Sequence, residues 1–176
     1  MTSPTVLFAL VAVSSAVFVV VQRTSPRTWA FATKPVPMLL LLLGLFACGE
    51  PRDGTIRALL AAGLVASLAG DVFLVDEERC FLPGLASFLV AHLLYVAAFL
   101  RGADLAAAVP YAAAYLMVGA VLCGLLWPRL GKLRIPVLAY ALVLSAMCAA
   151  AWARGRADGS LLAPIGATLF YLSDGV

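Results

Sequence analysis

Long apolar runs alternate with short polar separators along the whole chain. Crossing a bilayer as a helix takes about 20 mainly apolar residues, within a range of about 17 to 25. Seven runs approach this length and each predicts a transmembrane helix: residues 4–21, 29–48, 56–75, 81–100, 105–127, 134–153 and 160–176. Separators such as GEPRDG and RGRADG are so short that consecutive helices become antiparallel neighbours. The pattern predicts an all-α, polytopic transmembrane helix bundle of about seven spans.

The two ends of the chain bear on its domain organisation. No basic residue precedes the run at 4–21 and no small-residue cleavage site follows it, which favours a retained first helix over a secretory signal. The last run ends in Asp174-Gly175-Val176 without a polar exit or a basic anchor. We therefore expect a single transmembrane domain over residues 1–176 that lacks its native C-terminal helix.

Composition supports a membrane location. Hydrophobic residues make up 64% of the chain and charged residues only 12%, whereas soluble domains carry about 25% charged residues. The mean hydropathy is +1.06. We expect a multi-pass integral protein whose solvent is the lipid bilayer, in the bacterial inner membrane. A formal net charge of +3 is too small and too dispersed to suggest nucleic acid as a partner.

Metal and cofactor chemistry has little support in the sequence. The chain has one histidine, and its four cysteines contain no CxxC pair. A zinc site of the usual His/Cys type is therefore not expected. Cysteines inside apolar runs are more simply interpreted as buried, inert thiols. We expect no metal and no cofactor.

Two aspartates stand near the ends of apolar runs. Asp71 lies in LVASLAGDVFLV and Asp174 in APIGATLFYLSDGV. A charge at membrane depth costs at least a few kcal/mol, so it usually faces a protein interior or a wet cavity and marks function. Antiparallel threading puts both aspartates on one side of the membrane. These carboxylates are the first candidates for chemistry.

Further polar groups begin helices on the same side. Lys34 starts the second run, His92 and Tyr95 lie deeper in the fourth, and Tyr140 is about six residues, or ~9 Å, inside the sixth. Asp71 lies ~6 Å inside the end of its own helix by the same rise per residue. If the last helix packs near the second to fourth, these groups share one cavity that opens to one leaflet.

Each of these residues also has a purely structural interpretation. Asp71 and Lys34 could form a buried ion pair without a catalytic role. His92 could be a core histidine that donates to a backbone carbonyl. Tyr95 and Tyr140 could be interfacial aromatics with their hydroxyls among the headgroups. The residues alone leave these alternatives open.

The separator before the sixth run is basic. Arg129, Lys132 and Arg134 are interpreted as charges that set topology, with attraction of a lipid phosphate as the alternative. Trp127 and Trp152 stand at the predicted helix ends, which is typical of tryptophans of the interfacial belt.

The ordered polar positions resemble those of a known family. The stretch GDVFLVDEERCFLPGLASFLVAHLLYVAAF is similar to the central signature of the YhhN-like lysoplasmalogenases, which are multispanning membrane proteins. The positions that carry the resemblance are Gly70, Asp71, Phe81, Gly84, Phe88, His92 and Tyr95, preceded by Lys34-Pro35 and followed by Arg134, Pro136, Tyr140, Gly166, Phe170, Ser173 and Asp174. Family members are thought to have eight transmembrane helices, and this chain ends just after Ser173-Asp174.

The resemblance implies hydrolysis of the vinyl ether bond of lysoplasmalogens, with a lysophospholipid as substrate. The products would be a fatty aldehyde and glycerophosphocholine or glycerophosphoethanolamine. Asp71 and Asp174 match the positions proposed as catalytic in the family. Vinyl ethers hydrolyse by protonation of the β-carbon, so one carboxyl group must be protonated while the other stays ionised; burial and a nearby cation produce that difference.

We assign Asp174 as the general acid and Asp71, beside Lys34, as the carboxylate that stabilises the cation and activates water; the reverse assignment stays open. His92, Tyr95 and Tyr140 would orient water or the glycerol hydroxyl. The tail would occupy an apolar cleft between helices, with the headgroup near Lys34 or Arg134. Competing hypotheses are a small membrane transporter, because intramembrane charges also build ion pathways, and a non-catalytic lipid-binding protein.

Overall fold

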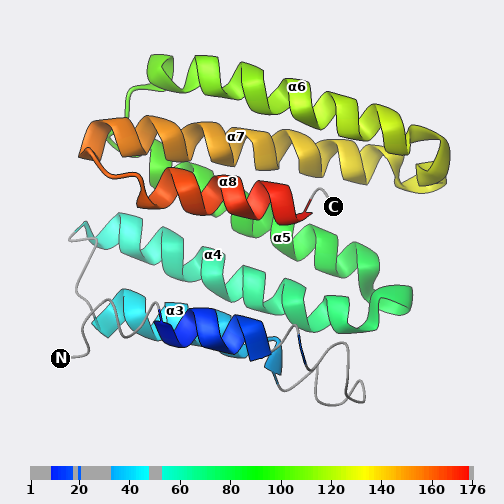
Figure 1. Ribbon diagram of the computed structural model, residues 1–176, viewed down its shortest axis with the longest axis horizontal. Coiled ribbons are helices and arrows are strands. Elements are labelled where there is room, and N and C mark those ends of the chain that lie inside the picture. The colour runs from blue at the N-terminus through cyan, green and yellow to red at the C-terminus, as the bar shows by residue number, and fades with distance from the viewer. Residues whose placement is uncertain (1–8, 18–19, 21–32, 48–52, 175–176) are drawn as a thin grey trace. The chain divides into compact units, whose positions relative to one another are not determined.

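The described part of the chain is almost entirely helical. The computed structural model describes residues 9–17, 20, 33–47 and 53–174, and no strand occurs among them. Residues 9–17 are helical, and the later helices are α3 (Val36–Ala47), α4 (Gly54–Phe73), α5 (Glu77–Leu100), α6 (Leu105–Leu130), α7 (Arg134–Asp158) and α8 (Leu162–Asp174) (Figure 1). The prediction of an all-α fold is confirmed.

Several helices have the length and composition of membrane spans. The described stretches that qualify are Gly54–Asp76, Arg79–Leu100 and Leu105–Asp158, and the third contains both α6 and α7. Val36–Ala47 and Leu162–Ser173 are apolar but shorter. The number of about seven crossings stays a prediction, and parts of the first two predicted runs, at 4–8 and 29–32, lie outside the described residues.

The polar separators start and stop these helices. The Asp53 carboxylate accepts hydrogen bonds from the backbone N–H groups of Thr55 (2.8 Å) and Ile56 (3.1 Å) at the start of α4. Asp104 caps α6 in the same way through the N–H of Ala106 (2.9 Å). Gly159 ends α7 with a φ of 68°, a left-handed conformation that glycine adopts without strain. Short polar loops thus satisfy the backbone groups that helix ends expose.

The chain divides within α5 into two compact units, Met1–Ala91 and His92–Val176. In the first unit α4 and the beginning of α5 approach closely at two glycines. A Cβ added to Gly70 would lie 2.7 Å from the ring of Phe88, and one added to Gly84 would lie 2.7 Å from the side chain of Leu74. The absence of a side chain at these positions lets the two helices pack closely.

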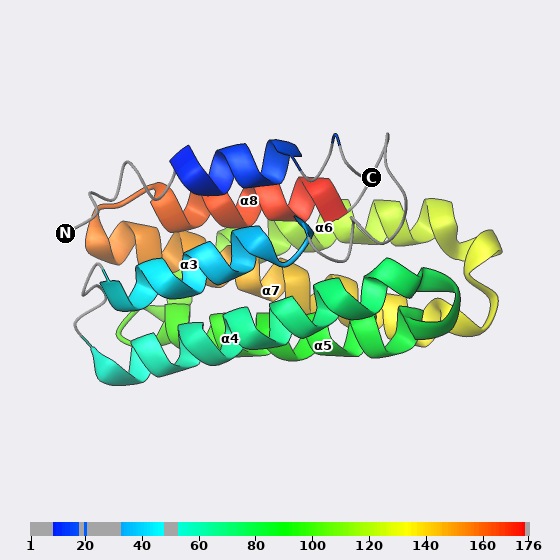
Figure 2. The same cartoon turned by 90° about the horizontal axis from the view of Figure 1, so that it is seen from below.

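In the second unit α6, the 3-10 turn η2 (Gly131–Leu133) and α7 form an antiparallel hairpin, and α8 returns along α7 (Figure 1, Figure 2). The α7–α8 turn is tight: a Cβ on Gly155 would lie 2.5 Å from the ring of Pro164. The core of this unit comes mostly from α7, with two residues of α8: Leu144, Met147, Cys148, Ala151, Ala167 and Tyr171. The small residues of α7 make it the central helix of the unit.

Candidate active site

A buried histidine lies at the centre of an aromatic cluster in the second unit. His92 of α5 is 1% exposed. Its ring centroid lies 5.1 Å from that of Phe170, 5.4 Å from that of Tyr140 and 6.2 Å from that of Tyr95, each in an edge-on arrangement. Helices α5, α7 and α8 therefore meet at this imidazole. The structure brings together His92, Tyr95 and Tyr140, while their roles stay predictions.

The sequence resemblance included Phe170, but its contact with His92 was not foreseen. Phe170 is four residues before Asp174 on α8, so both lie on the same side of that helix. Its packing against the imidazole fixes the rotation of α8 at this point. The signal in the sequence was the spacing of four residues, which alone does not tell which neighbour the helix face meets.

Hydrogen bonds tie α8 to the hairpin deeper in the unit. The hydroxyl oxygens of Tyr115 and Thr168 lie 2.6 Å apart, and the Trp152 indole N–H donates to Tyr115 (3.0 Å) and to Thr168 (3.3 Å). The Thr168 hydroxyl is also 2.7 Å from the carbonyl of Pro164. These groups join α6, α7 and α8 in one polar network within apolar surroundings.

Trp152 does not stand at the end of its helix as expected, while its place in an interfacial belt stays a prediction. Helix α7 continues to Asp158, because Arg154 pairs with Asp158 one turn later and donates a 2.7 Å hydrogen bond to the carbonyl of Arg101. The Trp152 ring instead stacks on Tyr111, with centroids 5.1 Å apart. The charged residues of the separator belong to the helix, and the half-buried tryptophan lies six residues before its end.

Tyr171 adds a second connection between the same helices. Its hydroxyl donates to the backbone carbonyl of Tyr115 (2.8 Å) and lies 3.5 Å from the hydroxyl of Ser145. The Ser145 hydroxyl donates to the carbonyl of Ala141 (2.7 Å). Tyr171 is 4% exposed and stands three residues before Asp174. It is a buried support for the end of α8 that sequence reasoning missed.

The two candidate carboxylates belong to different units. Asp71 is half-buried near the end of α4, and Lys34 is half-buried in the turn before α3, both in the first unit. Asp174 is the last residue of α8 in the second unit, and its side chain lies outside the described part. The meeting of Asp71 with Asp174, and the pairing of Asp71 with Lys34, stay predictions.

Arg134 lies at the turn of the hairpin. Its guanidinium carbon is 5.0 Å from the centroid of the Trp127 ring, and its Nε donates to the Trp127 carbonyl (3.3 Å). A guanidinium over a tryptophan face is favoured by the ring quadrupole. Arg134 is exposed, so its remaining N–H groups face the surroundings. It stands on the second unit with His92 and Tyr140.

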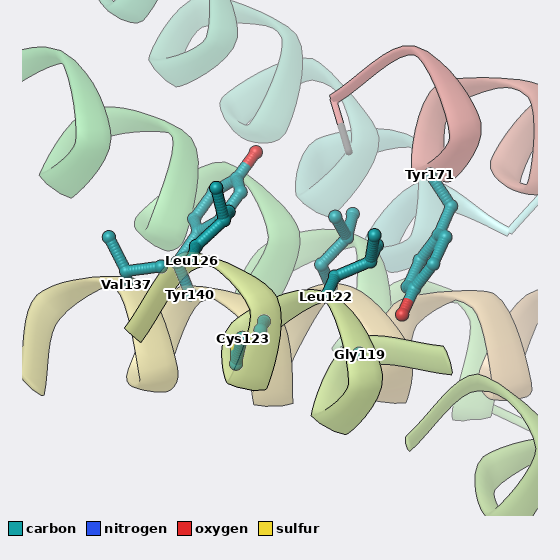
Figure 3. A pocket seen from close by; sticks show the side chains of 9 residues that line it. Gly119, Leu122, Cys123, Leu126, Val137, Tyr140 and Tyr171 are labelled. Atoms are coloured by element: carbon teal, nitrogen blue, oxygen red, sulfur yellow. The ribbon is translucent and has the colours of Figure 1, made fainter. Parts of the chain in front are cut away.

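A half-open hollow lies between α6 and α7 (Figure 3). It encloses about 100 Å³ and its lining is mainly apolar. Leu122, Cys123 and Leu126 of α6 face Val137 and Tyr140 of α7. The far end is bordered by Gly119, Leu144 and Tyr171. Because Tyr140 also contacts His92, this one side chain joins the hollow to the aromatic cluster.

Metal-binding groups are not gathered in the described part of the chain. No three or more His, Cys, Asp or Glu side chains among those residues lie close enough to hold a metal ion. The described cysteines Cys80, Cys123 and Cys148 are free thiols.

The YhhN family model matches residues 29–176. The chain belongs to the YhhN family. The uncharacterized membrane protein YhhN of Escherichia coli O157:H7 is 31% identical over 151 residues, which cover 84% of this chain and 71% of that protein. No solved structure matches this YhhN family chain.

Other proteins similar to this chain are named as enzymes. Human lysoplasmalogenase TMEM86B is 37% identical over 153 residues, covering 85% of this chain and 62% of that protein. The lysoplasmalogenase of Mycobacterium tuberculosis is 36% identical over 145 residues, covering 77% of this chain and 54% of that protein. A relative is named a membrane protein, and several helices of this chain are long and apolar enough to span a membrane. The chain is therefore an integral membrane protein.

Proposed function

We propose that this YhhN family chain is a lysoplasmalogenase, an ether-bond hydrolase of the membrane. It cleaves the vinyl ether bond of alkenyl-glycerophosphocholine or alkenyl-glycerophosphoethanolamine to a fatty aldehyde and the glycerophospho alcohol. The observation that carries the proposal is its similarity, over most of its length, to human and mycobacterial proteins named lysoplasmalogenase. We also propose that the protein resides in the bacterial inner membrane.

The reaction needs an acid, a base and water. A protonated carboxyl group gives its proton to the β-carbon of the vinyl ether, which forms a C–H bond and an oxocarbenium ion. A second carboxylate takes a proton from water as the oxygen attacks the cation. As the C–O bond of the hemiacetal to the glycerol breaks, the second carboxyl group returns its proton to the leaving oxygen and the first carboxylate takes the proton of the hemiacetal hydroxyl. The aldehyde and the alcohol leave, and both carboxyl groups regain their starting states. Two carboxyl groups in unlike environments divide these roles.

The register of α7 and α8 supports Asp174 as the acid. The Gly155 backbone packs on Pro164, the Cys148 thiol donates to the carbonyl of Ala167 (3.3 Å), and the Ser145 hydroxyl lies 3.5 Å from that of Tyr171. Helices α7 and α8 are therefore antiparallel, and each later residue of α8 lies beside an earlier residue of α7.

Continuing this register by one turn brings the backbone of Asp174 level with Ala141, next to Tyr140. The acid would then border both the hollow and the His92 cluster. Apolar surroundings raise the pKa of a carboxyl group, which favours the protonated form that the first step requires.

Asp71 and Lys34 provide the second carboxylate and its cation in this scheme. A nearby ammonium keeps a carboxylate ionised, which suits stabilisation of the oxocarbenium ion and activation of water. Tyr140, which borders the hollow and contacts His92, would orient the glycerol hydroxyl or water, and Tyr95 and His92 would hold that ring. The two aspartates could exchange roles without changing the groups required.

The proposal is tested by trapping aldehyde from purified protein supplied with a panel of lysolipids. Asp174→Asn and Asp71→Asn should each lower aldehyde release by about 10²–10⁴-fold, the usual contribution of a proton-transfer group, while the protein stays folded. Asp158→Asn is the matched control, because that carboxylate is exposed and pairs with Arg154. Full activity in either variant would refute the two-aspartate scheme. Absence of aldehyde from the unaltered protein would favour a transporter or a lipid-binding protein instead.

A further inference from the structure

The hollow and the basic turn form one continuous feature of the α6–α7 hairpin. Leu126 and Val137 line the hollow nearest the turn, and Gly119 and Leu144 line it at the far end. Seven residues separate the two levels on each helix, or ~10 Å at 1.5 Å per residue. Arg134 stands one helical turn before Val137. Arg134 therefore stands on α7 about one turn beyond the end of the hollow that is nearest the hairpin turn.

The turn of the α6–α7 hairpin carries an excess of positive charge. Arg129, Lys132 and Arg134 are all exposed, and the sequence contains no Asp or Glu between residues 105 and 157. Basic groups next to a membrane span attract anionic lipid headgroups. Arg134 is held by Trp127 through both its ring and its carbonyl. A pre-oriented guanidinium suits two-point recognition of a phosphate.

The size of the hollow restricts what fills it. An apolar cavity of about 150 Å³ holds one benzene ring. A hollow of about 100 Å³ therefore accommodates a short segment of one hydrocarbon chain, such as the single chain of a lysolipid.

We infer that the α6–α7 hairpin is the substrate seat: Arg134 binds the phosphate of a lysophospholipid and the hollow holds the first part of its single chain. The inference rests on the proposed function and selects Arg134 over Lys34 for the headgroup. Arg134 and Ala141 are seven residues apart, or ~10 Å along α7. The phosphate ester, the glycerol and the ether linkage together span this interval, so the vinyl ether lies level with Tyr140, where the α8 register brings Asp174.

This proposed binding site can be tested without catalytic turnover, by asking whether a lysolipid protects an introduced cysteine from a thiol reagent. Leu122→Cys places a thiol in the hollow, and Leu125→Cys places one on the same helix at a position that is 69% exposed and does not line it. Each full-length variant is reconstituted in phosphatidylcholine nanodiscs. It is then treated with a small thiol reagent, with or without a saturated alkyl-ether lysophosphatidylcholine, which has no vinyl group to protonate. Labelling is followed by tandem mass spectrometry, which assigns the label to residue 122, 125 or the native Cys123 within the same peptide.

The lysolipid should slow labelling at position 122 several-fold and leave position 125 unchanged. Arg134→Gln should raise the lysolipid concentration for half-protection about tenfold, the effect of one lost charge-assisted hydrogen bond. A phosphate-free alkylglycerol should protect position 122 equally in both backgrounds.

The inference is overturned if the lysolipid protects neither position, or both alike. It is also overturned if position 122 is already protected in phosphatidylcholine alone, because a bilayer lipid or another helix would then occupy the hollow. Protection at position 122 without any aldehyde release would support the seat and refute the lysoplasmalogenase proposal. Aldehyde release without protection would do the reverse.

Discussion

The two units of the chain hold their helices together by different means. In the first unit α4 and α5 pack through Gly70 and Gly84, where an added Cβ would overlap Phe88 or Leu74. In the second unit α8 is tied to α6 and α7 by the hydroxyls of Tyr115, Thr168 and Tyr171. Because lipid tails are as apolar as the helix surfaces, the hydrophobic effect does not drive helices in a membrane to associate. Close packing and hydrogen bonds stabilise their association instead.

The difference has a consequence for the candidate site. Close packing beside Gly70 positions the neighbouring Asp71 by shape, and it tolerates no added volume. The hydrogen-bonded network positions α8, and hence Asp174, by directed contacts that survive small changes of shape. The first unit should therefore be sensitive to the size of a substitution, and the second to the loss of a polar atom.

The largest effect is expected at Gly70. Gly70→Ala forces the Phe88 ring to move, because its nearest atoms lie 2.7 Å from the new Cβ. Overpacking of this kind costs about 1–3 kcal/mol of unfolding free energy, measured by denaturant titration in mixed micelles. The matched control is Gly124→Ala, where nothing lies within 4 Å, and which should be neutral or slightly stabilising. Equal losses in the two variants would contradict packing by close approach.

A smaller effect is expected from the hydroxyl pair. Tyr115→Phe and Thr168→Val remove the two ends of the 2.6 Å hydrogen bond. A double-mutant cycle on unfolding free energy should give a coupling of about 0.6 kcal/mol, the average for hydrogen bonds between membrane helices. Pairing Tyr115→Phe with the distant Gly124→Ala should give no coupling. Strict additivity would mean that the hydrogen bond between these two hydroxyls does not help to hold α8.

The smallest effect is expected at the ion pair in the last turn of α7. Asp158→Asn breaks its contact with Arg154, and the two side chains are 44% and 24% exposed. Exposed pairs one helical turn apart contribute about 0.3–0.5 kcal/mol, and salt screens them. Stability measured at low and at high salt should show this loss only at low salt. A large loss that does not depend on salt would contradict this. It would mean that Asp158 is required to hold Arg154 in its hydrogen bond to the Arg101 carbonyl.

Local rules predicted the elements well. The apolar runs gave the helices, and the caps at Asp53 and Asp104 fall in the polar separators, as short loops require. His92 and Tyr95 are three residues apart, so their proximity on one helix follows from helical geometry. The antiparallel order of the helices also predicted that Tyr140 lies near the start of a helix that begins on the same side of the membrane as the helix of His92. Tyr140 does contact His92.

Contacts between distant segments were not predictable in the same way. Trp152 was predicted at a helix end, but α7 continues past it and its indole bonds to Tyr115 and Thr168. In a soluble helix the apolar stripe tells which face is buried, but a membrane helix is apolar all round. The pattern therefore contained no marker of the face that α6, α7 and α8 turn toward one another.

The sequence by itself determined the helical fold class, its membrane setting and, through the ordered motif residues, the family. Those features depend on composition and on residues near one another in the chain. Only the tertiary structure decided that His92 meets Tyr140 and Phe170, that Tyr171 anchors α8, and that an apolar hollow lies between α6 and α7. These depend on helix rotation and register, which packing volume and hydrogen bonds fix after the helices have formed.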